Sequence, residues 1–184
     1  MLADKSLGEI ELVMQSMIAQ TRNYFENEHN TRMSDVDSDS GTEEVDSSTL
    51  LDMTAVIGMG GLINLQAVFS FQTSLVNAVY AWMTVGFFDS IEDTEGHREA
   101  AIRELVNTVL GHCTIDLQHL DRQGIPLTPP VIVDPDNLFP EMNSSVCSRH
   151  CLLSRFGRLN ISLVGPKKVC PAKPESLRKA THGK

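Results

Sequence analysis

The stretch HREAAIRELVNTVLGHCTIDL, residues 97–117, has the pattern of one long amphipathic helix. Its apolar residues recur at the helical period, at Ile102, Leu105, Val106, Val109, Cys113 and Leu117. At ~3.6 residues per turn, Glu104, Asn107 and Gly111 share the opposite side, which faces solvent. Glycine inside a helix costs about 1 kcal/mol relative to alanine, so Gly111 indicates that something comes close to this side. We expect the helix to run to about Leu120 and to be ended by Gly124 and Pro126.

The chain before this helix predicts a first helix and a hairpin. Residues 5–27 carry their apolar side chains along one stripe, as an amphipathic helix does. Residues 53–61 (MTAVIGMGG) and 62–71 (LINLQAVFSF) read as two strands, because alternate positions of the second are apolar. The pair Gly60-Gly61 suits a tight turn between them.

A further helix and three strands complete the predicted elements. Residues 72–87 return to the helical period, with Thr73 or Ser74 as the N-cap and Gly86 as the stop. Short strands are predicted at 129–134, 146–153 and 158–164. This order predicts an α+β domain in which helices pack on a mostly antiparallel sheet.

Composition limits the chain to one domain and excludes some partners. With 184 residues and 41% hydrophobic content it can bury one core, which we place at residues 1–165. Residues 34–50 are acidic and Ser-rich and read as a loop, whereas residues 166–184 read as a basic flexible tail. The net charge of −9 argues against nucleic acid as a partner. Without a signal peptide or a long apolar run, we expect a cytoplasmic protein with no membrane insertion.

The four cysteines are expected to be reduced thiols, because the chain shows no secretion signal. The segment CSRHC, with Cys147, His150 and Cys151, and the pair His112-Cys113 leave a metal or redox site open as an alternative. Zinc sites usually show two paired elements, and only one C-x3-C is present. Cysteines as small buried hydrophobes are the better account, and no metal site is predicted.

Three segments together resemble the CheC/CheX/FliY phosphatases of bacterial chemotaxis, and the CheX branch in particular. The helix carries ELVNTVLG at residues 104–111, which is similar to the family's E-x-x-N-x-x-x-G. The hairpin resembles the family's I-G-x-x-G, with Gly58 and Gly61 in the expected places, and IPLTPPVIV at 125–133 resembles its Pro-Pro segment. This chain departs from the family at Arg103, where a glycine or small residue is usual. Only one E-x-x-N copy is present, as in CheX.

The resemblance implies a protein aspartyl-phosphate phosphatase whose substrate is the phosphorylated receiver domain of a CheY-like response regulator. Glu104 and Asn107 would be the catalytic residues. The amide of Asn107 can accept a hydrogen bond from the attacking water and donate one to a phosphoryl oxygen. Glu104 could pair with the receiver's lysine, Gly111 would leave the helix surface low for docking, and Arg103 would lie at the docked surface. The receiver would bring Mg²⁺, so this chain needs no cofactor of its own.

Two further points stay open from the sequence. A CheX-like module could bind a receiver or another partner without hydrolysis. Arg103 beside Glu104 supports that alternative, because it could compete for the carboxylate or repel the receiver's lysine. The resemblance to CheX also implies a homodimer formed through a sheet edge.

Overall fold

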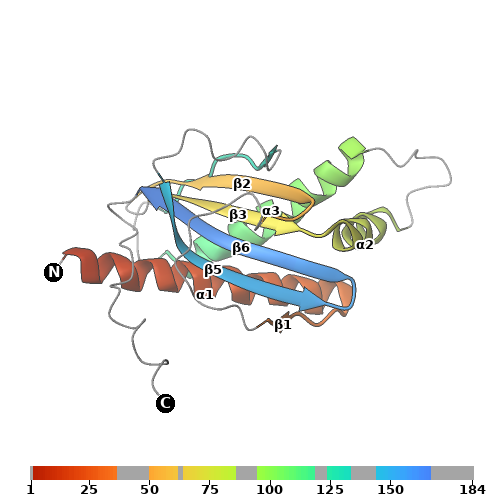
Figure 1. Cartoon of the computed structure of the whole chain (residues 1–184), viewed down its shortest axis with the longest axis horizontal. Coiled ribbons are helices and arrows are strands. Elements are labelled where there is room, and N and C mark those ends of the chain that lie inside the picture. Colours follow the sequence, from red (N-terminus) through yellow and green to blue (C-terminus); the bar gives the residue numbers. More distant parts are fainter. Residues whose placement is uncertain are drawn as a thin grey trace, which may run out of the picture.

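The computed structural model describes residues 2–36, 50–61, 64–85, 95–118, 124–133 and 144–166. Within these ranges three helices pack on a six-stranded sheet (Figure 1). The elements are α1 (Leu2–His29), β1 (Ser34–Asp35), β2 (Met53–Met59), β3 (Leu65–Phe71), α2 (Thr73–Thr84), α3 (Glu95–Asp116), β4 (Val131–Val133), β5 (Ser144–Ser154) and β6 (Gly157–Pro166). The predicted α+β class is confirmed. None of the described helices is long and apolar enough to cross a membrane.

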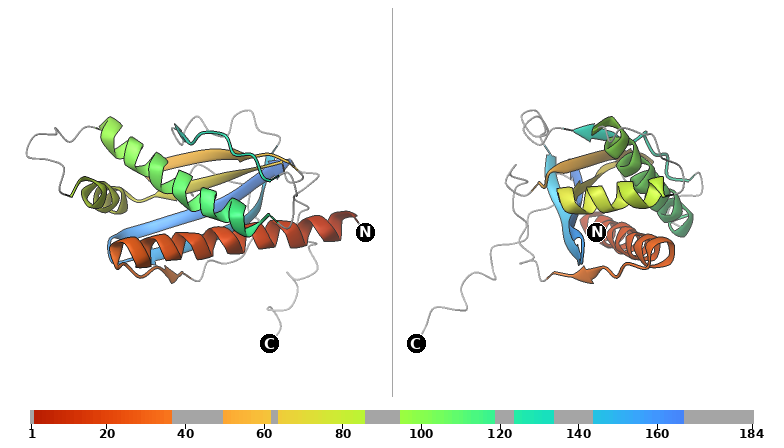
Figure 2. Two further views of the ribbon diagram at one scale, coloured as in Figure 1. Left: turned by 180° about the vertical axis from the view of Figure 1, so that it is seen from behind. Right: turned by 90° about the vertical axis from the view of Figure 1, so that its right-hand side faces the viewer.

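The sheet has the order β1-β5-β6-β3-β2-β4, and all of its neighbouring strands are antiparallel. The predicted hairpin is present as β2–β3, and the strands predicted at 146–153 and 158–164 also pair, as β5–β6. β3 begins at Leu65 and not at residue 62, so residues 60–64 join the strands in place of a two-glycine turn. Gly61 has φ of 86°, a left-handed conformation that glycine adopts without strain. The helices lie on one side of the sheet, with α1 and α3 across its face and α2 at one end (Figure 2).

The ends of α1 and α2 use side chains and backbone that the sequence pattern did not reveal. α1 stops at Asn30, whose φ of 46° lets its N–H and that of Thr31 bond the carbonyls of Glu26 and Phe25. The N-cap of α2 is Gln72, not Thr73 or Ser74, and its side chain makes no capping bond.

Asp52 supplies the cap of α2 from the start of the hairpin. Its Oδ2 accepts bonds from the N–H of Thr73 at 2.7 Å and from the Thr73 hydroxyl at 2.6 Å. These two bonds favour the ionised carboxylate and lower the pKa of Asp52. Thr73 therefore donates to a cap and does not act as one. The predicted stop at Gly86 lies outside the described residues.

The acidic segment begins in the sheet. Ser34 and Asp35, which the sequence placed in the loop 34–50, form β1 and pair with Leu152 and Leu153 of β5. The carboxylate of Asp35 bonds Arg22 of α1 and, at 2.6 Å, Nε2 of His150. A negative side chain on an edge strand is thus satisfied by two basic neighbours, which composition alone cannot reveal. Residues 37–49 lie outside the described part of the chain. At the other end β6 runs through Pro166, one residue into the predicted tail, and 167–184 are likewise outside.

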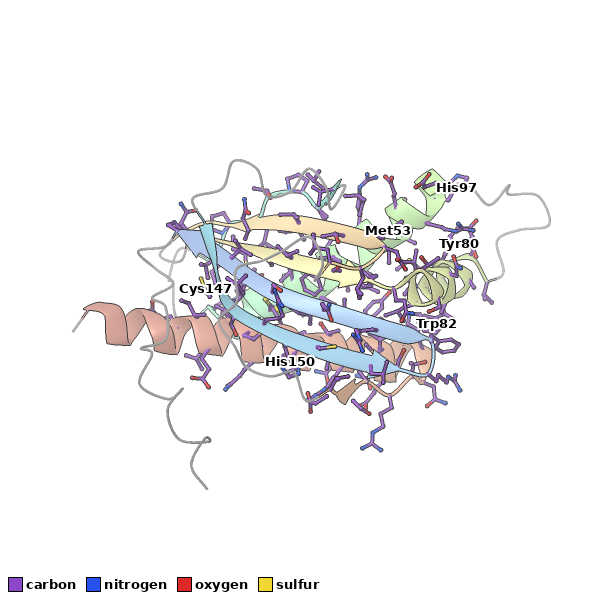
Figure 3. All side chains as sticks on the ribbon, in the orientation of Figure 1. Met53, Tyr80, Trp82, His97, Cys147 and His150 are labelled. Atoms are coloured by element: carbon purple, nitrogen blue, oxygen red, sulfur yellow. The ribbon has the colours of Figure 1, made fainter. Side chains whose placement is uncertain are left out.

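The cysteines differ from one another. Cys113 and Cys151 are buried free thiols, as expected. Cys147 is disulfide-bonded, which corrects the expectation of four reduced thiols. Figure 3 shows Cys147 and His150 along β5. The expectation rested on compartment alone, whereas a bond also depends on whether the fold brings a second thiol within reach.

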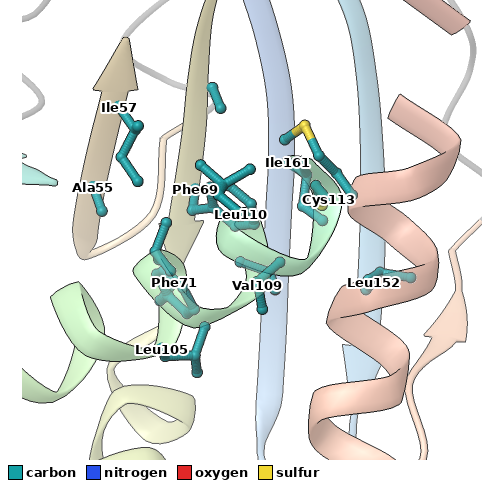
Figure 4. Packing of buried hydrophobic residues seen from close by; sticks show 14 of the residues in the cluster. Ala55, Ile57, Phe69, Phe71, Leu105, Val109, Leu110, Cys113, Leu152 and Ile161 are labelled. Atoms are coloured by element: carbon teal, nitrogen blue, oxygen red, sulfur yellow. The ribbon is translucent and has the colours of Figure 1, made fainter. Parts of the chain in front are cut away.

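The core lies between the sheet and the helices. The inward positions of β3 and those of β2 from Ala55 onward are fully buried, and Phe69 and Phe71 face α3 (Figure 4). All six residues of the predicted α3 stripe are buried, which confirms the amphipathic reading of the opening stretch. The helix ends at Asp116, four residues before the predicted end, and the Asp116 carboxylate accepts bonds from Ser16 at 3.0 Å and Gln20 at 2.7 Å of α1. α3 is therefore held by its buried face and by α1, with its other face left to solvent.

Candidate functional site on helix α3

Glu104 and Asn107 lie on the exposed side of α3. Both side chains are exposed, whereas Leu105 and Val106 between them are fully buried. A separation of three residues turns them about 60° apart around the helix axis, on neighbouring turns. The apolar stripe thus fixes the orientation of the polar pair. Among the described residues, none forms a hydrogen bond or ion pair with the Glu104 carboxylate or the Asn107 amide.

Arg103 is engaged away from Glu104. Its guanidinium forms an ion pair with Glu99, one turn earlier, at 2.7 Å. Adjacent residues on a helix point about 100° apart, so Arg103 and Glu104 occupy different sides of α3. The sequence-based idea that Arg103 competes for Glu104 finds no contact to support it in the structure.

Gly111 is free of any internal packing requirement. A Cβ placed there would meet no atom within 4 Å. Its carbonyl accepts a bond from the Thr114 hydroxyl at 2.8 Å, which a larger residue at 111 would not prevent. The helical cost of this glycine is therefore not offset by a contact among the described residues.

A cleft between α1 and α3 opens next to these residues, and the sequence analysis missed it. It has a volume of about 390 Å³. Its lining comprises Gln20, Asn23, Tyr24, Asn27, Glu28 and His29 of α1 with Thr108 and His112 of α3. The signal in the sequence was a run of polar residues at the end of the first helix. The α3 residues that face it follow some eighty positions later, and no local sequence pattern links the two segments.

Tyr24 lines the cleft, and its phenol has a raised pKa. Burial first, and then the negative charges of Glu28 and Glu104, together raise the pKa of Tyr24 to about 12. The phenol therefore stays protonated and is a hydrogen-bond donor.

No protein-family model matches the sequence, and no curated protein matches it. Solved structures do. CheX of Desulfovibrio desulfuricans has a TM-score of 0.66 at 17% identity, covering 82% of this chain and 97% of that one. The CheX–CheY–BeF3–Mg²⁺ complex of Borrelia burgdorferi has a TM-score of 0.56 at 12% sequence identity, and the match covers 83% of this chain and 96% of that one. FliY of Thermotoga maritima has a TM-score of 0.62 at 12% sequence identity, and the match covers 90% of this chain and 92% of that one.

The similarity extends over nearly the whole of each neighbour while the identity stays below 20%. The chain has the CheX-like fold of the CheC, CheX and FliY proteins. This agrees with the family that the three sequence segments resemble. In the CheX-like fold the polar pair Glu104 and Asn107 belongs to the long helix that packs beside α1 on the sheet.

The other two resembling segments contact each other in this CheX-like fold. The N–H of Gly58 donates to the Thr128 hydroxyl at 2.8 Å, and the Thr128 N–H donates to the Gly58 carbonyl at 2.9 Å. A Cβ at Gly58 would lie 3.0 Å from Cγ2 of Thr128. Gly58 of the hairpin and Thr128 of the Pro-Pro segment thus hold these two segments together near the sheet edge. This contact has a structural role.

The residues considered for a metal or redox site have other partners. His150 bonds Asp35, Cys147 is disulfide-bonded, and Cys151 is buried. Burial raises the pKa of the Cys151 thiol, which opposes the thiolate form that a metal requires. In the part of the chain that is described, no group of three His, Cys, Asp or Glu side chains could hold a metal ion.

Proposed function

We propose that this CheX-like chain is a phosphatase for the phospho-aspartate of a CheY-like receiver domain, in chemotaxis or related two-component signalling. The observation that carries the proposal is the pair Glu104 and Asn107, one turn apart on an exposed face and unengaged among the described residues. A structure with the same fold contains CheY with BeF3 and Mg²⁺, which supports a receiver as the partner. A receiver partner would place the protein in the cytoplasm.

The proposed chemistry divides between two side chains. Hydrolysis of an acyl phosphate needs a water held in line with the phosphorus, and positioning supplies most of the catalysis. The Asn107 amide accepts from the water through its oxygen and donates to a phosphoryl oxygen through its nitrogen. Glu104 pairs with the receiver's lysine and holds the two proteins in register. The receiver would bring Mg²⁺, which would supply neutralisation of charge on the phosphoryl group.

The direct test is the lifetime of a phosphorylated CheY-type receiver with and without this protein. We expect the rate constant of phosphate loss to rise at least about tenfold, which corresponds to a barrier lower by about 1.4 kcal/mol. The rate should level off as the protein is raised, because a docked complex forms first. Binding of a BeF3-activated receiver with an unchanged phosphate lifetime would instead establish the binding-only module.

The same proposal includes a homodimer joined at a sheet edge. β4 is an outermost strand, and Val131 on it is 56% exposed. Unpaired backbone on such a strand can accept a second chain. Light scattering at tens of micromolar should give twice the chain mass, since a Kd near 1 μM (about −8 kcal/mol) is then exceeded. Val131→Lys should shift the protein toward monomer, and a wild-type monomer at this concentration would remove the dimer from the proposal.

A further inference from the structure

The proposed docking face does not end at α3. Thr108, which follows Asn107 and lies one turn after Glu104, forms part of the cleft wall. His112, which follows Gly111, forms another part. The opposite wall is α1, so a partner that covers the exposed face of α3 also meets this second helix.

The α1 wall is polar and carries negative charge. None of the described residues that line the cleft is lysine or arginine, and their amides and hydroxyls can bond a protein partner. Asn27 and Glu28 are exposed there, at the end of the cleft wall. The negative charges of Glu28 on α1 and Glu104 on α3 both raise the pKa of the half-buried Tyr24 phenol in the cleft wall.

We propose that α1 forms the second half of the receiver-docking surface, with Asn27 and Glu28 selecting receivers that present a basic side chain to the cleft. This rests on the receiver-binding role proposed above and adds the basis on which receivers are distinguished. A lysine or arginine of the receiver gains from complementary charge and from the aromatic face of Tyr24. Asn107 performs the chemistry, and α1 determines which receiver reaches it.

The cleft has an intrinsic reporter. His29 lines it and stacks on Trp82, with ring centroids 4.4 Å apart and planes 15° from parallel. Trp82 is the only tryptophan of the chain, and it also contacts Phe156 at the β5–β6 turn (Figure 3). A partner seated in the cleft should therefore alter Trp82 emission through His29.

The experiment compares Glu28→Lys with Glu26→Lys. Both residues are exposed on α1 and both changes add the same charge, but Glu26 does not line the cleft. Each full-length variant is titrated with a tryptophan-free, BeF3-activated CheY-type receiver, and Trp82 emission is followed. Glu28→Lys should raise Kd about tenfold or more, because it reverses a charge that contacts the receiver directly in the cleft. Glu26→Lys should raise Kd less than about twofold, because it changes only the long-range attraction, which both substitutions alter alike. The dephosphorylation rate at saturating protein should match wild type for Glu26→Lys.

The outcomes separate this inference from the proposed function. Wild-type binding with equal Kd for the two variants would overturn the inference and leave the phosphatase proposal intact. No binding of the receiver by wild type would overturn both. Asn27→Lys serves as a second cleft variant if Glu28→Lys alters the melting temperature, and the inference requires that it too weaken binding.

Discussion

Asn107→Ala should remove about 100-fold or more of the accelerated receiver dephosphorylation while receiver binding stays within about threefold. Loss of a single preorganised hydrogen-bonding group aimed at the transition state typically costs 10² to 10³ in rate, that is about 3–4 kcal/mol. The amide is needed for the water and the phosphoryl oxygen as the bonds change, more than for contact in the docked state. Phosphate loss and BeF3-receiver binding should be measured side by side.

The matched control is Asn77→Ala, which removes an exposed asparagine from α2, outside the proposed face. It should turn over the receiver at the wild-type rate. Asn107 is exposed, so its loss should leave the melting temperature nearly unchanged. If Asn107→Ala kept wild-type activity, another group would have to position the attacking water, and the central claim of the mechanism would be wrong.

Phe69→Ala should lower the free energy of unfolding by about 3–5 kcal/mol, the cost of deleting a large buried side chain and leaving a cavity. Phe69 is 0% exposed, and its register neighbours on the two flanking strands are Ala55 and Ile161. Ala55 is too small to fill the space, and α3 lies above it (Figure 4). Urea unfolding followed by circular dichroism measures the change, with the slope compared to that of wild type.

Leu12→Ala is the control for this prediction, because Leu12 is 43% exposed on α1. It should change the free energy of unfolding by no more than about 0.5 kcal/mol. A similarly small effect at Phe69 would mean that the sheet and α3 close over the vacated space, contrary to the packing described.

The elements could be predicted where one face is uniformly apolar. The α3 stripe and the alternation at Leu65 to Phe71 both report local burial, which the period of the sequence encodes. Features that join distant segments could not be read in this way. The Asp52 cap, the entry of Asp35 into the sheet and the disulfide at Cys147 each depend on a partner that only the fold brings near.

The same distinction between local features and features that join distant segments applies to the candidate site. Glu104 and Asn107 could be placed on the solvent side of a helix from spacing alone, and the structure has them there. Their roles stay a proposal that the receiver experiments decide. The α1 wall of the cleft was not predicted, because the cleft lies between α1 and α3, which the chain separates by a hairpin and a third helix.

The cap of α2 makes that helix dependent on the hairpin before it. Asp52 stands next to β2 and bonds Thr73 just after β3, so the capping carboxylate reaches the helix only when the two strands have paired. The hairpin and α2 are in this sense one cooperative unit. Because the pKa of Asp52 is lowered in the folded chain, the stability it contributes is present above the ordinary carboxyl range and is lost as the pH falls through the lowered value. Acid therefore loosens the start of the helix and its tie to the strands in a single protonation.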